Sequence, residues 1–129
     1  MEDDVQNPTD DKTWVVDFFR DVDAMDRDRI GPWLSPNYET RLGNRPVVRG
    51  KEAALDNSAR FWATLRSMRH QIEEIVIDGD KAVSLAIVTY TRLDGSAVSM
   101  PVATYLRRSG ERQVDRVQVY IDLAPLLGT

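Results

Sequence analysis

Two aspartates and an arginine are the residues in this 129-residue sequence that best suit acid–base chemistry. Arg92 and Asp94 are two positions apart in a segment with strand-like alternation, so their side chains would share one face. Asp122 stands late in the last apolar segment, and Asn44 ends the first strand-like one. An ionised carboxylate can take a proton from water, and a second carboxyl group kept protonated by burial can donate one. With Arg92 between the two acids, the set would suit opening an epoxide by water.

Each of these residues also has a structural interpretation. Asp94 precedes Gly95, and an Asp-Gly pair is typical of a hairpin turn, which would leave Arg92 as a surface charge at a strand end. Asp122 could organise the sheet edge or accept hydrogen bonds from the neighbouring loop, because an unpaired carboxylate in an apolar strand is costly. Asn44 could be a turn former after Gly43.

His70, the only histidine, opens a strand-like segment. A lone strand histidine is more often a hydrogen-bonded structural residue than a catalytic one. Phe18 and Trp62 lie at helical spacing among other apolar residues, which favours a place in the core or in the wall of a pocket.

Composition excludes several classes of protein. The absence of cysteine rules out disulfide frameworks and thiolate metal sites, and a single histidine rules out a multi-histidine metal site. The net charge is −4, but residues 1–11 hold five acids and no base, so the remainder is almost neutral and gives no reason to expect nucleic-acid binding. No apolar run approaches the ~18–20 residues of a membrane span. We expect a cytoplasmic protein with a flexible acidic tail over 1–11 and one domain over 12–129.

The periodicity of the apolar residues changes along the chain. The first half has helical spacing with one short strand, and from residue 69 the period becomes that of strands joined by Gly-containing turns. This order predicts an α+β fold with the helices on one face of a curved antiparallel sheet. The predicted helices are 13–30 and 51–67, and the predicted strands are 38–44, 70–77, 82–94, 98–107 and 113–123.

Several local phrases accompany this order of elements. They are Arg41-Leu42-Gly43-Asn44-Arg45-Pro46, Met68-Arg69-His70, Thr89-Tyr90-Thr91-Arg92-Leu93-Asp94-Gly95 and Tyr120-Ile121-Asp122-Leu123-Ala124-Pro125. Together they resemble the SnoaL-like members of the nuclear-transport-factor-like superfamily, over about residues 13–127. The resemblance implies a cystatin-like cone, in which a curved sheet wrapped around N-terminal helices encloses a small-molecule pocket. It also implies a homodimer.

Within that superfamily, the charged residues resemble the site of limonene-epoxide hydrolases. The resemblance implies that Asp122 is the base, Asn44 helps to hold water, Arg92 bridges and Asp94 is the acid. Where that family has a tyrosine two residues before its asparagine, this chain has Leu42. The residues expected to contact an apolar substrate are Tyr38, Leu42, His70, Tyr90, Tyr120, Phe18 and Trp62.

The preferred function is therefore an epoxide hydrolase-like enzyme that uses water and needs neither cofactor nor metal. A ketosteroid isomerase is disfavoured, because Asn44 and Phe18 occupy the places of its base and its tyrosine. A polyketide cyclase-like acid–base enzyme using Asp122 or Asp94 with His70 is the first alternative. A non-catalytic ligand-binding or dimerisation module of the same fold is the second.

Overall fold

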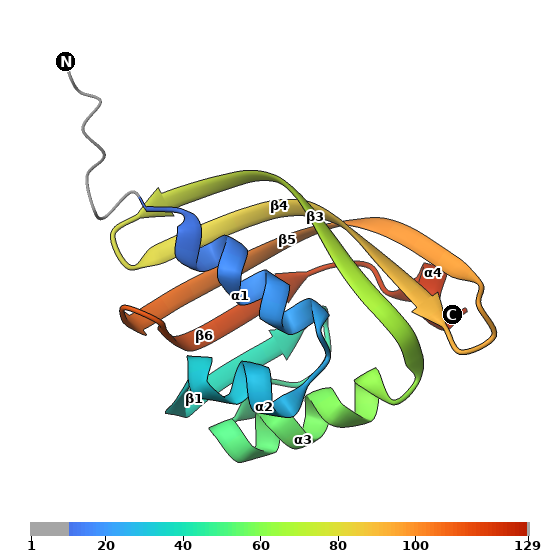
Figure 1. Ribbon diagram of the computed structural model, residues 1–129, viewed down its shortest axis with the longest axis horizontal. Coiled ribbons are helices and arrows are strands. Elements are labelled where there is room, and N and C mark those ends of the chain that lie inside the picture. The colour runs from blue at the N-terminus through green and yellow to red at the C-terminus, as the bar shows by residue number, and fades with distance from the viewer. Residues whose placement is uncertain (1–10, 129) are drawn as a thin grey trace.

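The computed structural model describes residues 11–128, which form a curved sheet partly covered by helices (Figure 1). The predicted tail over 1–11 lies outside the described residues except for Asp11, whose carboxylate accepts a hydrogen bond from the backbone N–H of Thr13. Among residues 11–128, no helix has both the length and the apolar composition needed to cross a membrane. The helical elements are α1 (Thr13–Asp23), α2 (Arg27–Ile30), the 3-10 turn η2 (Gly31–Trp33), α3 (Lys51–Trp62) and α4 (Ala124–Leu127).

The sheet has six strands in the order β2-β1-β6-β5-β4-β3. Neighbouring strands are antiparallel except β1 and β6, which run parallel. Long β3, β4 and β5 follow one another through short turns and form the curved part of the sheet (Figure 1). This arrangement confirms the predicted α+β class. The strands are β1 (Leu34–Leu42), β2 (Val48–Arg49), β3 (Leu65–Asp78), β4 (Lys81–Arg92), β5 (Ala97–Gly110) and β6 (Gln113–Tyr120).

The ends of several elements differ from the sequence-based expectation. The single helix predicted over 13–30 is interrupted, because Met25 takes a left-handed backbone conformation (φ 53°) and Asp26 then caps α2. The helix predicted to reach residue 67 ends at Trp62, where the hydroxyl of Thr64 donates to the carbonyl of Phe61. The first strand starts earlier than predicted, since a register shift between Leu34 and Glu39 accommodates Pro36 within it.

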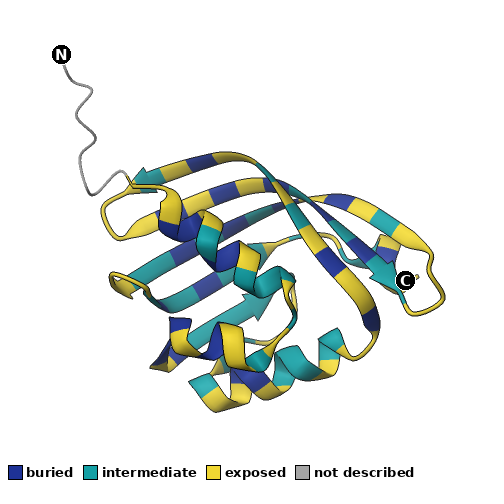
Figure 2. Ribbon diagram, in the orientation of Figure 1, coloured by how far each residue is buried: buried dark blue, intermediate teal, exposed yellow. Residues whose placement is uncertain are grey.

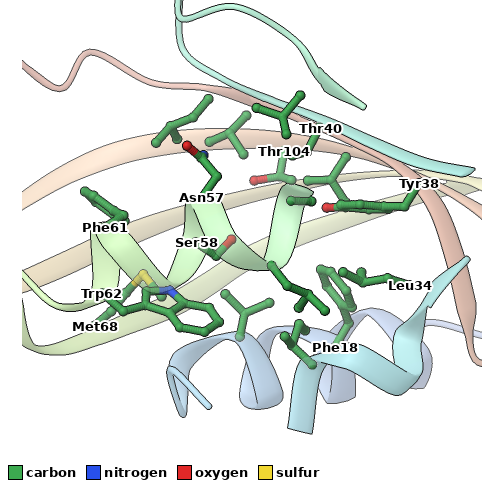
Figure 3. A pocket seen from close by; sticks show the side chains of 18 of the residues that line it. Phe18, Leu34, Tyr38, Thr40, Asn57, Ser58, Phe61, Trp62, Met68 and Thr104 are labelled. Carbon is green, nitrogen blue, oxygen red and sulfur yellow. The ribbon is translucent and has the colours of Figure 1, made fainter. Parts of the chain in front are cut away.

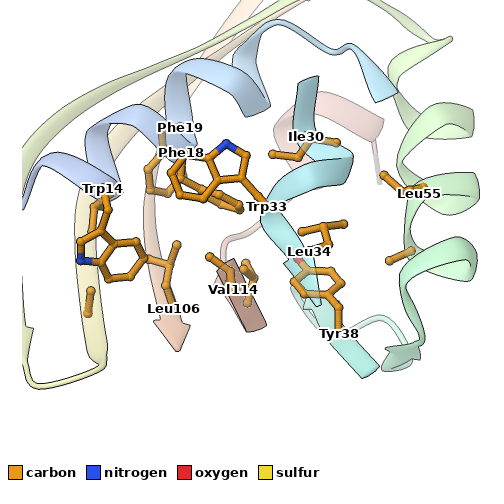
Figure 4. Packing of buried hydrophobic residues seen from close by; sticks show 14 of the residues in the cluster. Trp14, Phe18, Phe19, Ile30, Trp33, Leu34, Tyr38, Leu55, Leu106 and Val114 are labelled. Atoms are coloured by element: carbon orange, nitrogen blue, oxygen red, sulfur yellow. The ribbon is translucent and has the colours of Figure 1, made fainter. Parts of the chain in front are cut away.

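The inner face of the sheet carries the core. Along β4, every second residue from Ala82 to Tyr90 is buried, and their neighbours are more exposed (Figure 2). Helix α1 covers this face with Trp14, Phe18 and two other buried side chains at helical spacing. Phe18 packs edge-to-face on Trp33, with ring centroids 5.4 Å apart, above Leu106 and Val114 of the sheet (Figure 4). The helices thus hold one end of the curved sheet closed and leave a cavity beside this core.

Candidate functional site

A cavity of about 340 Å³ lies between the inner face of the sheet and helices α1 and α3 (Figure 3). This volume is at the small end of the range for ligand pockets, ~300–1,000 Å³. Most of the lining side chains are apolar. The basic side chains in the lining are those of His70 and Arg45. The apolar lining includes Phe18, Val22, Leu55, Phe61, Trp62 and Met68.

Asp23 and His70 form a hydrogen-bonded pair at the wall of this cavity. Nδ1 of His70 lies 2.7 Å from one carboxylate oxygen of Asp23, and the backbone N–H of His70 donates to the other oxygen at 2.7 Å. The side chains are 8% and 20% exposed. Because an ionised carboxylate can only accept, Nδ1 is the donor in this contact, and in the neutral imidazole Nε2 then has the lone pair that can accept a proton. The arrangement is that of an oriented general base lining a cavity.

The position of Asp23 follows from the end of α1. Asp23 stands four residues after buried Phe19 on this helix, so the two side chains lie on the same side. The Phe19 ring also packs on the imidazole of His70, with centroids 4.7 Å apart. Helix α1 therefore places both a carboxylate and an aromatic ring against His70 of β3.

Tyr90 lies beside this pair on the neighbouring strand. In the register of β3 and β4, Met68 is opposite Tyr90 and His70 is opposite Val88, so His70 and Tyr90 are diagonal neighbours on the inner face. Burial raises the pKa of Tyr90 to about 12, and the negative charge of Asp23 adds to the shift. Tyr90 is therefore protonated at neutral pH and can serve as a hydrogen-bond donor to a ligand in the cavity.

A second polar group lies farther along the cavity. Figure 3 shows Phe61, Trp62 and Met68 at one end and Tyr38 at the other, with the hydroxyl oxygens of Tyr38, Ser58 and Thr104 turned towards the space between. Burial raises the pKa of Tyr38 to about 12, although its neighbour Thr40 opposes the shift. Tyr38 is thus also a donor at neutral pH.

The structure does not bring together the four residues predicted to be catalytic. Arg92 donates to the hydroxyl of Ser96 and to the backbone carbonyls of Pro125 and Leu126. One oxygen of Asp94 accepts from the backbone N–H and the hydroxyl of Ser96, and these bonds lower the pKa of the exposed Asp94 carboxyl. Both side chains therefore shape the turn between β4 and β5 and its contact with α4.

Asp122 and Asn44 are also outside the cavity. The Asp122 carboxylate accepts from the backbone N–H of Ala124 at 3.0 Å, just before α4, and the residue is exposed. Asn44 is exposed in the turn after β1. None of these four side chains lines the cavity. The prediction that they converge in one pocket is wrong. Asp94 and Asp122 accept from backbone groups two residues ahead, whereas Arg92 donates to backbone carbonyls of α4, more than 30 residues away.

Most of the residues predicted to contact a substrate do line the cavity, although their role in binding stays a prediction. Tyr120 does not, since it is 58% exposed. The sequence analysis did not single out Asp23. The signal that could have revealed it is its spacing of four from Phe19. The predicted contact residues that do line the cavity are Phe18, Tyr38, Leu42, Trp62, His70 and Tyr90.

Comparison with known proteins gives the class to which this fold and cavity belong. Residues 15–116 match the family model described as the SnoaL-like domain, so the chain belongs to the SnoaL-like domain family. No curated protein matches the sequence.

Solved structures share the fold at low sequence identity. A putative SnoaL-like polyketide cyclase from Jannaschia sp. CCS1 is similar with a TM-score of 0.80 and 18% identity, covering 98% of this chain and 95% of that one. An LEH-like epoxide hydrolase from M. tuberculosis is similar with a TM-score of 0.74 and 13% identity, covering 91% and 94%. At these identities the likeness concerns the fold, on which different chemistries are built.

Proposed function

We propose that this protein is a cofactor-independent acid–base enzyme, polyketide cyclase-like, that acts on an apolar carbonyl compound in the cavity. The observation that supports the proposal most directly is the Asp23–His70 pair, with Nδ1 of His70 2.7 Å from the Asp23 carboxylate, in the wall of a mainly apolar cavity. A histidine whose second nitrogen is bonded to a carboxylate is oriented and can hold a proton as imidazolium. The apolar wall excludes water that would compete for the proton.

The proposed reaction begins with removal of a proton from the carbon next to the substrate carbonyl. Nε2 of His70 takes this proton, the electron pair of the C–H bond forms the enolate, and the Asp23 carboxylate stabilises the imidazolium. The hydroxyl of Tyr90 donates a hydrogen bond to the enolate oxygen. If the enolate carbon then attacks a second carbonyl of the same molecule, a C–C bond closes the ring. The new alkoxide takes the proton back from His70.

Epoxide opening through Asp122, Arg92 and Asp94 is not part of this proposal. These three residues bond to neighbouring turn and backbone groups, and none of them lines the cavity. A water or an epoxide bound in the cavity would therefore not meet them.

The test is exchange of the α-protons of 2-tetralone in D₂O, followed by proton NMR, with ligand binding measured by line broadening in the same samples. We expect the wild-type protein to accelerate exchange and His70→Gln to reduce the acceleration by at least about 100-fold. Asp122→Asn is the matched control and should keep the wild-type rate within about twofold.

Two results would contradict the proposal. Bound 2-tetralone that exchanges no faster than in buffer would favour a non-catalytic binding module. If Asp122→Asn lost the accelerated exchange and His70→Gln kept it, Asp122 and not His70 would be the catalytic acid or base.

We also propose that two copies associate through the outer face of the sheet. Val76, Val83, Leu85 and Tyr120 are exposed apolar residues. Val76 is opposite Val83 in the sheet register, and Leu85 and Tyr120 share a cross-strand row. Sedimentation equilibrium should give twice the chain mass of 14.7 kDa, and Leu85→Lys should give the monomer. Leu127→Lys, at an exposed leucine of α4, is the control.

A further inference from the structure

Three hydroxyls, of which those of Thr104 and Tyr38 belong to buried residues, line the cavity. Thr104 is opposite Ser84 on β4, and His70 is opposite Val88, so the Thr104 hydroxyl is four residues along the sheet from the Asp23–His70 pair. Thr104 is 2% exposed and Tyr38 is 6% exposed, yet both line the cavity. Figure 3 shows their oxygens and that of Ser58 turned towards the same space, between Tyr38 and Trp62. The three residues come from β5, β1 and α3, so the group is assembled by the fold and not by one segment.

The Thr104 hydroxyl is the informative member of this group. On the inner face of β5 it stands between Val102 and Leu106, and valine would have the same shape as threonine there. Among residues 11–128, the buried side-chain polar atoms without a partner are Nε1 of Trp14 and Oγ of Ser84, and the Thr104 hydroxyl is not one of them. Because Thr104 lines the cavity, its hydroxyl can form a hydrogen bond with a ligand oxygen, which valine of the same shape could not. The position therefore has the chemistry of a contact to a ligand.

The group offers neutral donors and acceptors only. Tyr38 is protonated at neutral pH and donates, and the aliphatic hydroxyls of Thr104 and Ser58 can donate or accept. A carbonyl or hydroxyl oxygen matches these groups. These three side chains carry no positive charge, although the cavity lining does include Arg45, so the group itself is suited to a neutral oxygen function and not to a carboxylate.

We propose that Tyr38, Ser58 and Thr104 form a second subsite, which binds a neutral oxygen function of the substrate at a distance from the reacting carbonyl. This proposal rests on the function proposed above in one respect, namely that the substrate reacts where it meets His70. It specifies the substrate class as compact apolar compounds with oxygen functions at two separate positions. Such a ligand would be held at both ends, which fixes the carbon presented to His70.

The test compares ligands that differ by one oxygen. Dissociation constants are measured by NMR titration for 1-tetralone and for its 5-, 6- and 7-hydroxy derivatives. For the wild-type protein, we expect at least one hydroxylated ligand to bind about 5-fold more tightly than 1-tetralone, the value of one net hydrogen bond. Thr104→Val should abolish this preference while leaving the affinity for 1-tetralone within about twofold.

Two further variants separate the subsite from other effects. Thr89→Val is the matched control, because Thr89 is on β4, bonds to the hydroxyl of Ser99 and does not line the cavity. It should keep the wild-type preference. Tyr38→Phe should weaken the preference as Thr104→Val does, and thermal unfolding checks that each variant is folded.

The outcomes also separate this proposal from the proposed function. His70→Gln should lose α-proton exchange and keep the preference for the hydroxylated ligand. A wild-type preference retained in Thr104→Val, or no hydroxylated ligand that binds more tightly than 1-tetralone, would overturn the subsite. A preference lost in Thr104→Val together with exchange unaffected by His70→Gln would support the subsite and overturn the acid–base function.

Discussion

Two regions of this molecule hold aspartates by hydrogen bonds, and the regions differ in the range of these contacts. In the first region, Asp23 of α1 binds His70 of β3, 47 residues away in sequence, at the wall of the cavity. In the second, Asp94 and Asp122 each accept a hydrogen bond from the backbone two residues ahead. A partner two residues away shapes a turn, whereas a distant partner in a water-poor interior builds a site. The contrast shows that the spacing of two residues along a strand predicts that their side chains share a face, but does not predict whether that face is buried.

The largest expected difference between the two regions is in stability. Asp23→Ala leaves the part-buried backbone N–H and Nδ1–H of His70 without their acceptor, which should lower the free energy of unfolding by about 3 kcal/mol. Asp122→Ala removes one exposed hydrogen bond before a short helix and should cost no more than about 1 kcal/mol. Urea unfolding at pH 7 measures both. Equal losses would mean that the Asp23 contacts are no stronger than those of a surface turn.

The next effect concerns catalysis and compares two tyrosines. Tyr90→Phe should slow α-proton exchange of 2-tetralone by about 10- to 100-fold, because the enolate loses its hydrogen-bond donor. Tyr120→Phe should leave the rate unchanged, since Tyr120 is exposed outside the cavity. A fall in both variants, or in neither, would remove Tyr90 from the proposed mechanism.

A smaller effect is expected from the arginine of the second region. Arg92→Met removes the hydrogen bonds to the carbonyls of Pro125 and Leu126 that tie α4 to the end of β4. Part of this contact faces solvent, so the loss of stability should be about 1 kcal/mol. The exchange rate should not change. A drop in exchange without a drop in thermal stability would restore Arg92 as a catalytic residue.

An effect of similar size is expected from Asp21, another aspartate of α1. Burial raises the pKa of Asp21, but hydrogen bonds from Trp33 and Arg29 outweigh it, so the pKa lies below its usual value. A lowered pKa stabilises the fold at pH values above the ordinary value of about 4, and this stabilisation disappears as the pH falls further. Asp21→Asn should therefore destabilise by about 1 kcal/mol at pH 7. The difference from wild type should shrink below about pH 4 in thermal unfolding, and a constant difference would contradict this role.

Much of the fold was predictable, because it depends on periodicity. The change from helical to strand spacing near residue 69 predicted four strands after the second long helix, and the structure has β3 to β6 in this place, followed by the short helix α4, which was not predicted. The break at Met25 was not predictable in the same way, since a left-handed backbone at a methionine depends on its tertiary surroundings.

The site was predictable only in part. Apolar and aromatic lining residues such as Phe18 and Trp62 follow from which face of a helix is buried. Asp23 was missed because polarity alone assigns an aspartate to the solvent side, and its partner His70 is far away in sequence. Asp94 shows the reverse error. Asp94 was predicted to be catalytic, but its place in a turn explains its hydrogen bonds. The glycine that follows it in the sequence already indicates such a turn.

The carboxylate of Asp23 has a second consequence, for association between chains. Strand β3 is at the border of the sheet, so the backbone N–H of His70 that does not face β4 would be available to pair with a strand of another molecule. Asp23 occupies this donor, and α1 packs beside the strand. The contact that orients the imidazole therefore also blocks intermolecular sheet extension at this border, so loss of the carboxylate would promote aggregation as well as inactivation.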